Sequence, residues 1–287
     1  MAKDYDFRNA SELLALCGKY GMSISEVMIQ REMQLGKVSW ETVMKRLDRS
    51  LRVMDGAANR AYEDPVPSMG GLLGGEAQKL RGFPRGKSVL GSTLHKAVMF
   101  SLAVSETNAS MGVIVAAPTA GAAGVVPGAL LAVHEDMGIS VDALRMALIN
   151  ASAIGYIITR NGSVSGAEAG CQAEVGSAAA MAASAVAEVL GGTPEQCCHA
   201  ASIALSSLLG LVCDPVRGLV EVPCQTRNAA GVACAYTAAE LALSDIEFAV
   251  PLDEMIAIVY DVGHSMPKAL RETGLGGCAA APALCSK

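Results

Sequence analysis

The sequence predicts an all-α fold. Of its 287 residues, 48 are Ala, 30 are Gly and only 11 are aromatic, which favours closely packed helices over an aromatic-rich β-sandwich. Apolar residues recur at helical spacing from Ser92 onward, with few alternating β-branched residues. With 52% hydrophobic and 17% charged residues, the chain can bury a sizeable core, so disorder is not expected.

The first ninety residues hold 25 of the 50 charged side chains, which predicts a solvated helical layer. Three amphipathic helices are expected there, over residues 10–20, 24–35 and 40–62. Ser23 and Glu26 fit a capping box, and Gly36 is placed to end the helix that they open. Within one integrated domain we therefore expect an N-terminal layer (1–64), a Gly/Pro-rich connector (65–91) and a helical catalytic body (92–287).

The body is predicted to consist of seven helices joined by irregular loops. Thr193, Pro194 and Gln196 give the clearest helix start, with an N-cap, a proline at the first position and a capping-box glutamine. Loops of this kind in an otherwise regular core are where function tends to lie. The expected helices span 92–110, 126–137, 140–158, 171–190, 194–209, 227–244 and 252–264, and the loops that interrupt them span 117–128, 161–170 and 213–224.

Composition argues against nucleic acid and membrane partners. The net charge is −6 and no Lys/Arg cluster occurs, which disfavours a nucleic-acid surface. The longest charge-free stretch, 111–133, contains Pro118, Pro127 and four glycines, which would break a helix in lipid. No basic region followed by an apolar one opens the chain, so we expect a cytoplasmic protein.

Nine cysteines raise the question of ligands, since disulfides are disfavoured in the cytosol. Three of them, Cys171, Cys213 and Cys224, lie at loop or helix edges, and three thiolates presented from loops could hold an iron–sulfur cluster with one iron left open. No C-x-x-C occurs, so spacing alone is a weak signal. The others are Cys285 near the end of the chain and five that we assign to packing, Cys17, Cys197, Cys198, Cys234 and Cys278.

Two segments carry a resemblance to a known family. The stretches 163–177 and 211–229, which contain the three edge cysteines, closely resemble the iron–sulfur-dependent L-serine dehydratases, in particular the α chain of the two-subunit form. The intervals of 41 and 10 residues between the cysteines agree with that family. The resemblance runs from about Ser11 to Gly277, with further matches at 108–112, 117–121 and 191–196.

The resemblance implies a function and a cofactor. Cys171, Cys213 and Cys224 would bind a [4Fe–4S] cluster whose open iron acts as a Lewis acid, converting L-serine to pyruvate and ammonia without pyridoxal phosphate. The single-chain relatives carry an additional α/β domain, so a separate β chain and a hetero-oligomer are expected. In those relatives a cysteine near the C-terminus caps the open iron; Cys285 is a candidate for that role, and a frayed, exposed thiol is the alternative.

Other polar residues in the loops are candidates for substrate contacts. Ser163 and Ser165 could bind the substrate carboxylate or cap a helix, and Thr119 is a second donor. Arg227 could pair with that carboxylate or with a neighbouring glutamate. The carboxylates Asp214, Glu168 and Glu174 and the amide Asn228 could act on protons or orient other groups. None of His95, His134, His199 and His264 falls in a family motif, so we expect the α-proton base on the partner subunit.

Alternative functions remain open at this point. Gly86-Lys87-Ser88 is similar to a phosphate loop, but the spacing of its first glycine is wrong. Beyond Ser92 only Lys96, Lys268 and Lys287 remain, none in the context of a pyridoxal phosphate lysine. Because Ala122-Ala123 replaces a Ser-Cys pair of many α chains, a cysteine desulfidase-like lyase is the nearest rival. A non-catalytic iron–sulfur interaction subunit is the rival from another class.

Overall fold

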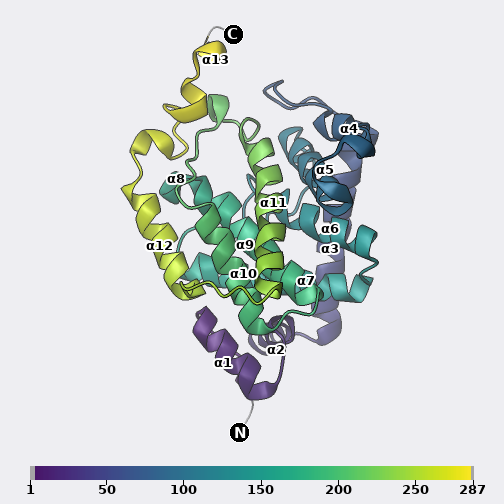
Figure 1. Cartoon of the computed structure of the whole chain (residues 1–287), viewed down its shortest axis with the longest axis vertical. Helices are drawn as coiled ribbons and strands as arrows, with labels where there is room; N and C mark the ends of the chain where they lie inside the picture. Colours follow the sequence, from purple (N-terminus) through teal and green to yellow (C-terminus); the bar gives the residue numbers. More distant parts are fainter. Residues whose placement is uncertain (1–3, 286–287) are drawn as a thin grey trace.

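The computed structural model describes residues 4–285, and these form helices joined by loops, without a β-sheet in that range (Figure 1). The one β-type contact in this part of the chain is an isolated bridge between Cys213 and Arg271. The predicted all-α class is therefore confirmed.

The N-terminal helices match their predicted positions. They are α1 (Ala10–Tyr20), α2 (Ile24–Gly36) and α3 (Trp40–Glu63). Ser23 and Glu26 form the predicted capping box of α2, and Lys37 adopts a left-handed conformation directly after Gly36. The helix α2 packs against α7 (Val141–Asn161), and α3 packs against α5 (Gly91–Ala109). The N-terminal layer is thus part of the same hydrophobic core as the body.

The body surrounds a central helix, α9 (Ser177–Val189). Every residue from Ser177 to Ala187 is buried, as is typical of a helix enclosed on all sides. It packs against α6, α7, α10 and α11. Of these, α6 spans Val125–Met137, α10 spans Pro194–Ser207 and α11 spans Cys224–Leu243, and α12 (Leu252–Ser265) packs against α10.

Glycines let backbones approach closely where α6 crosses α5. A Cβ added at Gly128 would lie 2.7 Å from the carbonyl oxygen of Ala97, and one at Gly124 would lie 2.5 Å from that of Ser101. Neither helix could hold this distance with larger side chains at the crossing. The abundance of small residues in the sequence therefore has a structural cause.

The structure differs from the predicted helices in four places, one of which is the end of α7, at Asn161 rather than at residue 158. The connector contains a short helix, α4 (Glu76–Arg81). The helix expected over 171–190 is preceded by α8 (Gly166–Ala169) and begins with a π-helical turn, Gln172–Gly176, before α9. The helix α11 begins at Cys224 rather than at residue 227. The division into layer, connector and body stays a prediction.

Within residues 4–285, one helix, α7, is long and apolar enough to cross a membrane, and 61% of its most apolar window is buried inside the protein. It lies against α2 and α9 within the bundle. After α12 the chain forms short turns and ends in α13 (Pro282–Cys285), at the end of the molecule opposite α1 and α2 (Figure 1).

Candidate metal or cluster site

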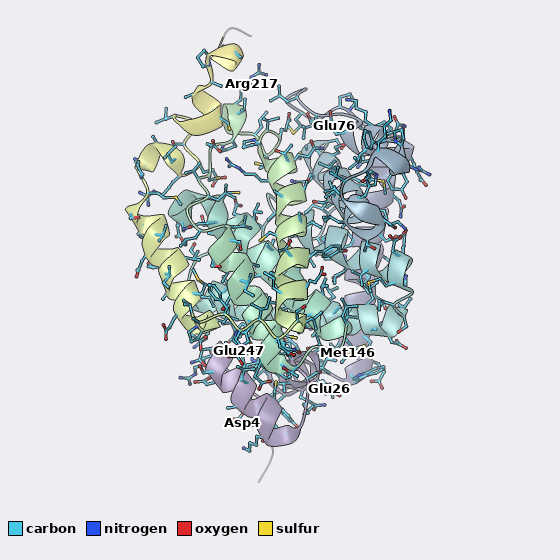
Figure 2. The ribbon with its side chains drawn as sticks, viewed as in Figure 1. Asp4, Glu26, Glu76, Met146, Arg217 and Glu247 are labelled. Carbon is cyan, nitrogen blue, oxygen red and sulfur yellow. The ribbon has the colours of Figure 1, made fainter. Side chains whose placement is uncertain are left out.

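The three edge cysteines lie on three segments that meet near the start of α11. Cys171 precedes the π-helical turn, Cys213 lies in the loop before α11, and Cys224 is the first residue of α11. Figure 2 marks the exposed tip of that loop with Arg217, at the end of the bundle opposite Asp4 and Glu26. Segments separated by about fifty residues of sequence thus converge at one end of the bundle.

The backbone at the first two cysteines is held from both sides. Gly170 has a φ of +75°, and a Cβ there would lie 2.8 Å from the carbonyl oxygen of Leu211, so the turn into Cys171 requires glycine. The N–H of Cys213 donates to the carbonyl of Leu270 (2.9 Å), and its carbonyl accepts from the N–H of Glu272 (2.7 Å). The segment after α12 therefore fixes the position of Cys213.

The three thiols lie close enough for the charge of one to affect the pKa of another. Burial, followed by the charge of Glu174, raises the pKa of Cys171 to about 11. Burial, followed by the charge of Cys171, raises the pKa of Cys224 to about 12. Burial and Glu174, and also the charges of Cys171 and Cys224, raise the pKa of Cys213. Each of the three pairs is coupled in this way, so all three sulfurs share one neighbourhood. A cation placed there would lower all three values together.

Glu174 brings a carboxylate to these thiols from the π-helical turn. Its Oε1 accepts a hydrogen bond from the Thr119 hydroxyl (2.9 Å), and its Oε2 lies 3.8 Å from the Sγ of Cys213, which donates to it. Burial raises the pKa of Glu174 above its ordinary value. No Lys, Arg or His of the described residues forms an ion pair with it. Glu174 is therefore a partly buried carboxylate without a cationic partner.

Two glycines make room for the carboxylate of Glu174. A Cβ added at Gly166 would lie 2.6 Å from its Oε2 and 2.8 Å from the Sγ of Cys213. A Cβ at Gly121 would lie 3.1 Å from its Oε1. The loop that contains Gly121 is held by Asn228, whose amide accepts from the N–H of Gly124 (2.9 Å) and donates to the carbonyl of Gly121 (2.7 Å).

Arg227 lies on the other side of the cysteines and is already paired. Its Nη1 is 2.6 Å from the Oδ1 of Asp214 and 2.7 Å from the carbonyl of Val212. The Arg227 charge also lowers the pKa of Cys171, against the larger effect of burial. Asp214 accepts a further hydrogen bond from the N–H of Cys278 (2.6 Å). The predicted role of Arg227 toward a substrate carboxylate stays a prediction; in the structure it meets an aspartate.

The two predicted serines lie in the loop before α8. The Ser163 hydroxyl donates to the carboxylate of Glu168 and accepts from the N–H of Ser165 (3.1 Å). Ser165 is the N-cap of α8 but makes no capping hydrogen bond with its side chain. Its hydroxyl is thus the freer of the two donors.

Two residues of the site, Glu174 and Cys278, are not singled out by the sequence. Glu174 is one candidate among several carboxylates in the sequence, and its three-residue distance from Cys171 was the signal that both could face the same side. Cys278 is exposed rather than packed, so its assignment to packing is wrong. It lies beside Asp214 because Gly277, with a φ of +59°, turns the chain against that carboxylate.

Comparison with known proteins identifies the family. Residues 19–279 match the family described as "Serine dehydratase alpha chain". The chain belongs to this family. Members of the serine dehydratase α-chain family are enzymes of the lyase class, and the predicted family membership is confirmed.

Individual relatives cover nearly all of the chain. It is 48% identical over 277 residues to "Probable L-serine dehydratase, alpha chain" of Bacillus subtilis (strain 168), covering 96% of this chain and 92% of the relative. It is 42% identical over 271 residues to "L-serine dehydratase, alpha chain" of Peptoniphilus asaccharolyticus, covering 94% and 93%. It is 39% identical over 293 residues to "L-serine dehydratase 1" of Escherichia coli (strain K12), covering 96% of this chain but 62% of the relative.

Proposed function

We propose that this chain is the α chain of a two-subunit L-serine dehydratase, which eliminates water from L-serine and yields pyruvate and ammonia. The observation that supports it most is the convergence of Cys171, Cys213 and Cys224, pairwise coupled and placed beside Glu174, in a member of the serine dehydratase α-chain family.

The donor set fits a [4Fe–4S] cluster better than a single ion. Among the described residues, no three His, Cys, Asp or Glu side chains stand close enough to ligate one metal ion. A cluster differs because each thiolate binds a different iron, so the sulfurs need not meet at one point. In this proposal the three cysteines hold the cluster, and when bound it supplies a Lewis-acidic iron that assists departure of the serine hydroxyl.

Glu174 provides the counter-charge for the substrate ammonium group. Its carboxylate is partly buried, has no cationic partner among the described residues and accepts from Thr119. An amino-acid substrate brings the missing positive charge, and the gain is larger away from bulk water. Thr119, oriented by this hydrogen bond, would then fix the rotamer of Glu174 and line the same space.

Ser165 and Ser163 are proposed as donors around the substrate carboxylate. Ser165 offers a hydroxyl without an assigned acceptor, whereas Ser163 acts through its bond to Ser165 and keeps the loop in shape. Arg227, held by Asp214, contributes positive charge near Cys171 rather than a direct contact. The substrate orientation thus comes from residues of four separate segments.

A β chain is proposed as partner, and the α-proton base is placed on it. Exposed apolar side chains support an interface near the site: Met69, Met111 and Val113 are 68%, 75% and 75% exposed. The N–H of Met69 donates to the carbonyl of Ala109, which places these residues together at the end of α5. The N–H of the neighbouring Gly70 donates a hydrogen bond to the carboxylate of Glu221, which lies in the loop between Cys213 and Cys224.

The proposed enzyme is cytoplasmic and uses no pyridoxal phosphate. Lys96, the one lysine in the central part of the body, forms ion pairs with Glu135 and Asp136. Hydrogen bonds to these carboxylates raise the pKa of Lys96 despite its burial, which keeps the amine protonated and unsuited to a Schiff base.

The proposal is tested by anaerobic reconstitution of the chain with iron and sulfide, with and without its β chain. Pyruvate and ammonia from L-serine are expected from the two-chain mixture only. Cys171→Ser, Cys213→Ser and Cys224→Ser should each lose iron, while Cys234→Ser, remote from the three, should retain it.

Sulfide from L-cysteine without pyruvate from serine would indicate a desulfidase. If iron binds and no product forms with the β chain, the subunit is non-catalytic. Full activity of all three serine variants would refute the site.

Cys285 is the proposed cap of the open iron, and its side chain lies outside the described residues. Cluster spectra recorded without serine should differ between the wild type and Cys285→Ser, with Cys278→Ser as the comparison. Identical spectra for the wild type and Cys285→Ser would contradict the cap.

A further inference from the structure

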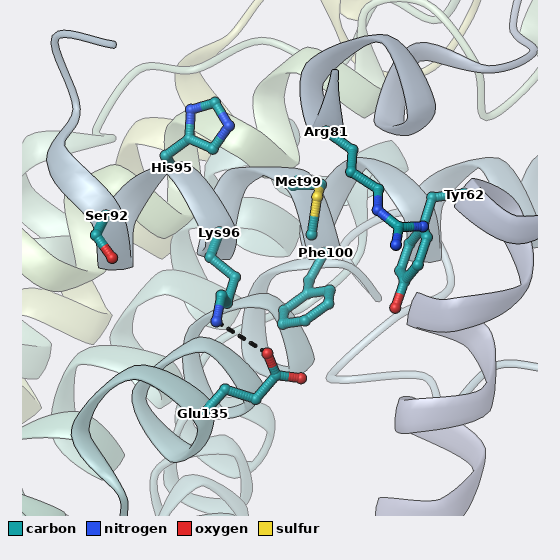
Figure 3. Close-up of a pocket in the computed structure, with 8 residues that line it drawn as sticks. All are labelled: Tyr62, Arg81, Ser92, His95, Lys96, Met99, Phe100 and Glu135. Atoms are coloured by element: carbon teal, nitrogen blue, oxygen red, sulfur yellow. Dashed lines mark ion pairs between the residues drawn. The ribbon is translucent and has the colours of Figure 1, made fainter. Parts of the chain in front are cut away.

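A cavity lies away from the cysteines, between the ends of α3, α4, α5 and α6 (Figure 3). Its volume is about 240 Å³, enough for a small organic molecule with ordered water. Its walls carry both signs of charge: Arg81, Lys96 and Glu135 reach into it beside Tyr62 and Phe100 (Figure 3).

The basic side chains of the cavity differ in the partners that they already have. Lys96 is bound to Glu135 (Nζ to Oε2, 3.0 Å) and to Asp136. His95 has both ring nitrogens occupied, one by Ser88 and the other by the carbonyl of Leu80. Arg81 has no ion pair among the described residues. Its guanidinium lies over the ring of Tyr62, 4.6 Å from the centroid.

The negative group is Glu135, and only one of its oxygens is engaged. The Oε2 faces Lys96, and the other oxygen points away from Lys96 into the cavity (Figure 3). The side chain is 46% exposed, so this oxygen is open to a ligand. Burial raises the pKa of Tyr62, the charge of Arg81 lowers it, and the charge of Glu135 adds to the rise, so the acid and the guanidinium both act on the same phenol group.

These charges select the class of ligand. A simple anion at Arg81 would be repelled by Glu135, and a simple amine at Glu135 would be repelled by Arg81. A zwitterion satisfies both groups, and its apolar part can lie against Met99 and Phe100. We propose that this cavity is a second binding site for a free α-amino acid, with Arg81 receiving the carboxylate and Glu135 the ammonium group.

The helix α5 connects this cavity to the cysteine site. It carries Lys96 at its beginning and, near its end, Glu106 and Asn108. Glu106 accepts from Gln225, the residue after Cys224 (3.1 Å), and Asn108 donates to the carbonyl of Ala120 (3.1 Å). An amino acid bound in this cavity thus lies against α5, the same helix that holds the start of α11 and the loop that contains Ala120.

The test measures binding of L-alanine to the full chain by titration calorimetry. L-Alanine is the probe because its β-carbon carries no leaving group and cannot be eliminated. The variants are Arg81→Ala, Arg81→Lys and Glu135→Gln, and the matched controls are Lys79→Ala on the same helix and Glu247→Gln at the far end of the bundle (Figure 2). Glu174→Gln separates this cavity from the proposed substrate site, because it removes the carboxylate that would receive the substrate ammonium group there.

The expected result is that Glu174→Gln, like the wild type and both controls, binds L-alanine in this cavity with the same affinity. Arg81→Ala and Glu135→Gln should each weaken binding by about tenfold or more, the effect of one lost charged hydrogen bond. Arg81→Lys should recover part of the loss, and L-lactate, which lacks the ammonium group, should not compete. Absence of binding, binding unchanged in both charge variants, or binding lost only in Glu174→Gln would overturn the proposal.

Discussion

Gly166→Ala tests the geometry around Glu174 with a single methyl group. The backbone at Gly166 is not left-handed, so alanine meets no conformational strain there. Its Cβ would lie 2.6 Å from the Oε2 of Glu174 and 2.8 Å from the Sγ of Cys213, below ordinary contact distances. Both groups must move by several tenths of an ångström. Such overpacking costs about 1–3 kcal/mol of the free energy of unfolding.

The assay compares Gly166→Ala with Gly176→Ala, a variant in the π-helical turn that carries Glu174. At Gly176 the nearest atom to a new Cβ is 3.8 Å away and φ is −62°, so this variant should fold and bind iron like the wild type. Urea unfolding, iron content after reconstitution and pyruvate formation are measured for both. We expect Gly166→Ala to lose stability, and to lose iron or activity as well. Wild-type values in all three measurements would refute the crowding inferred around Glu174.

Three further variants probe the supports of the site and one remote group. Asp214→Asn removes the buried carboxylate that pairs with partly buried Arg227 and should lower the free energy of unfolding by about 3 kcal/mol in chemical denaturation; a loss below 1 kcal/mol would contradict the ion pair. Glu221→Gln keeps one acceptor oxygen for the N–H groups of Gly70 and Leu72, so limited proteolysis should cut the 65–75 segment faster, and an unchanged rate would argue against this tether. Burial raises the pKa of Glu188 above 4.5, against hydrogen bonds from Ser25 and Asn150. The folded state therefore holds the proton more tightly, and stability falls as pH rises from the ordinary pKa through the raised one. Glu188→Gln should remove this fall, so its stability relative to the wild type increases across that window; a constant difference would contradict the shift.

Periodicity and capping chemistry predicted most of the helices because both are local. Thr193 and Gln196 form the capping box expected from their spacing, with Pro194 at the first helical position. The sequence contains no capping signal for α4, because Gly75 occupies the N-cap position and has no side chain that could accept a hydrogen bond. Its start is instead stabilised by Glu106, which accepts from the N–H groups of Gly75 and Ala77 across thirty residues of sequence.

The cysteine ligands and the carboxylate beside them differ in how far the sequence could predict them. The edge positions of Cys171, Cys213 and Cys224 are visible because Gly170, Pro215 and Pro223 flank them. That the sulfurs share one neighbourhood depends on long-range contacts, such as the pairing of Cys213 with residues 270–272. No local pattern encodes that pairing.

The π-helical turn explains why Glu174 could be placed only by the structure. A π turn inserts one extra residue into a helix and is frequent at functional sites. Here it spans Gln172–Gly176, and Gln172 holds it: its amide accepts from the N–H of Gly210 (2.7 Å) and donates to the carbonyl of Val259 (2.7 Å). A regular helix through these residues would rotate Glu174 by about 100° relative to α9. The long-range hydrogen bonds of buried Gln172 therefore determine where the carboxylate of Glu174 lies, in the turn that follows Cys171.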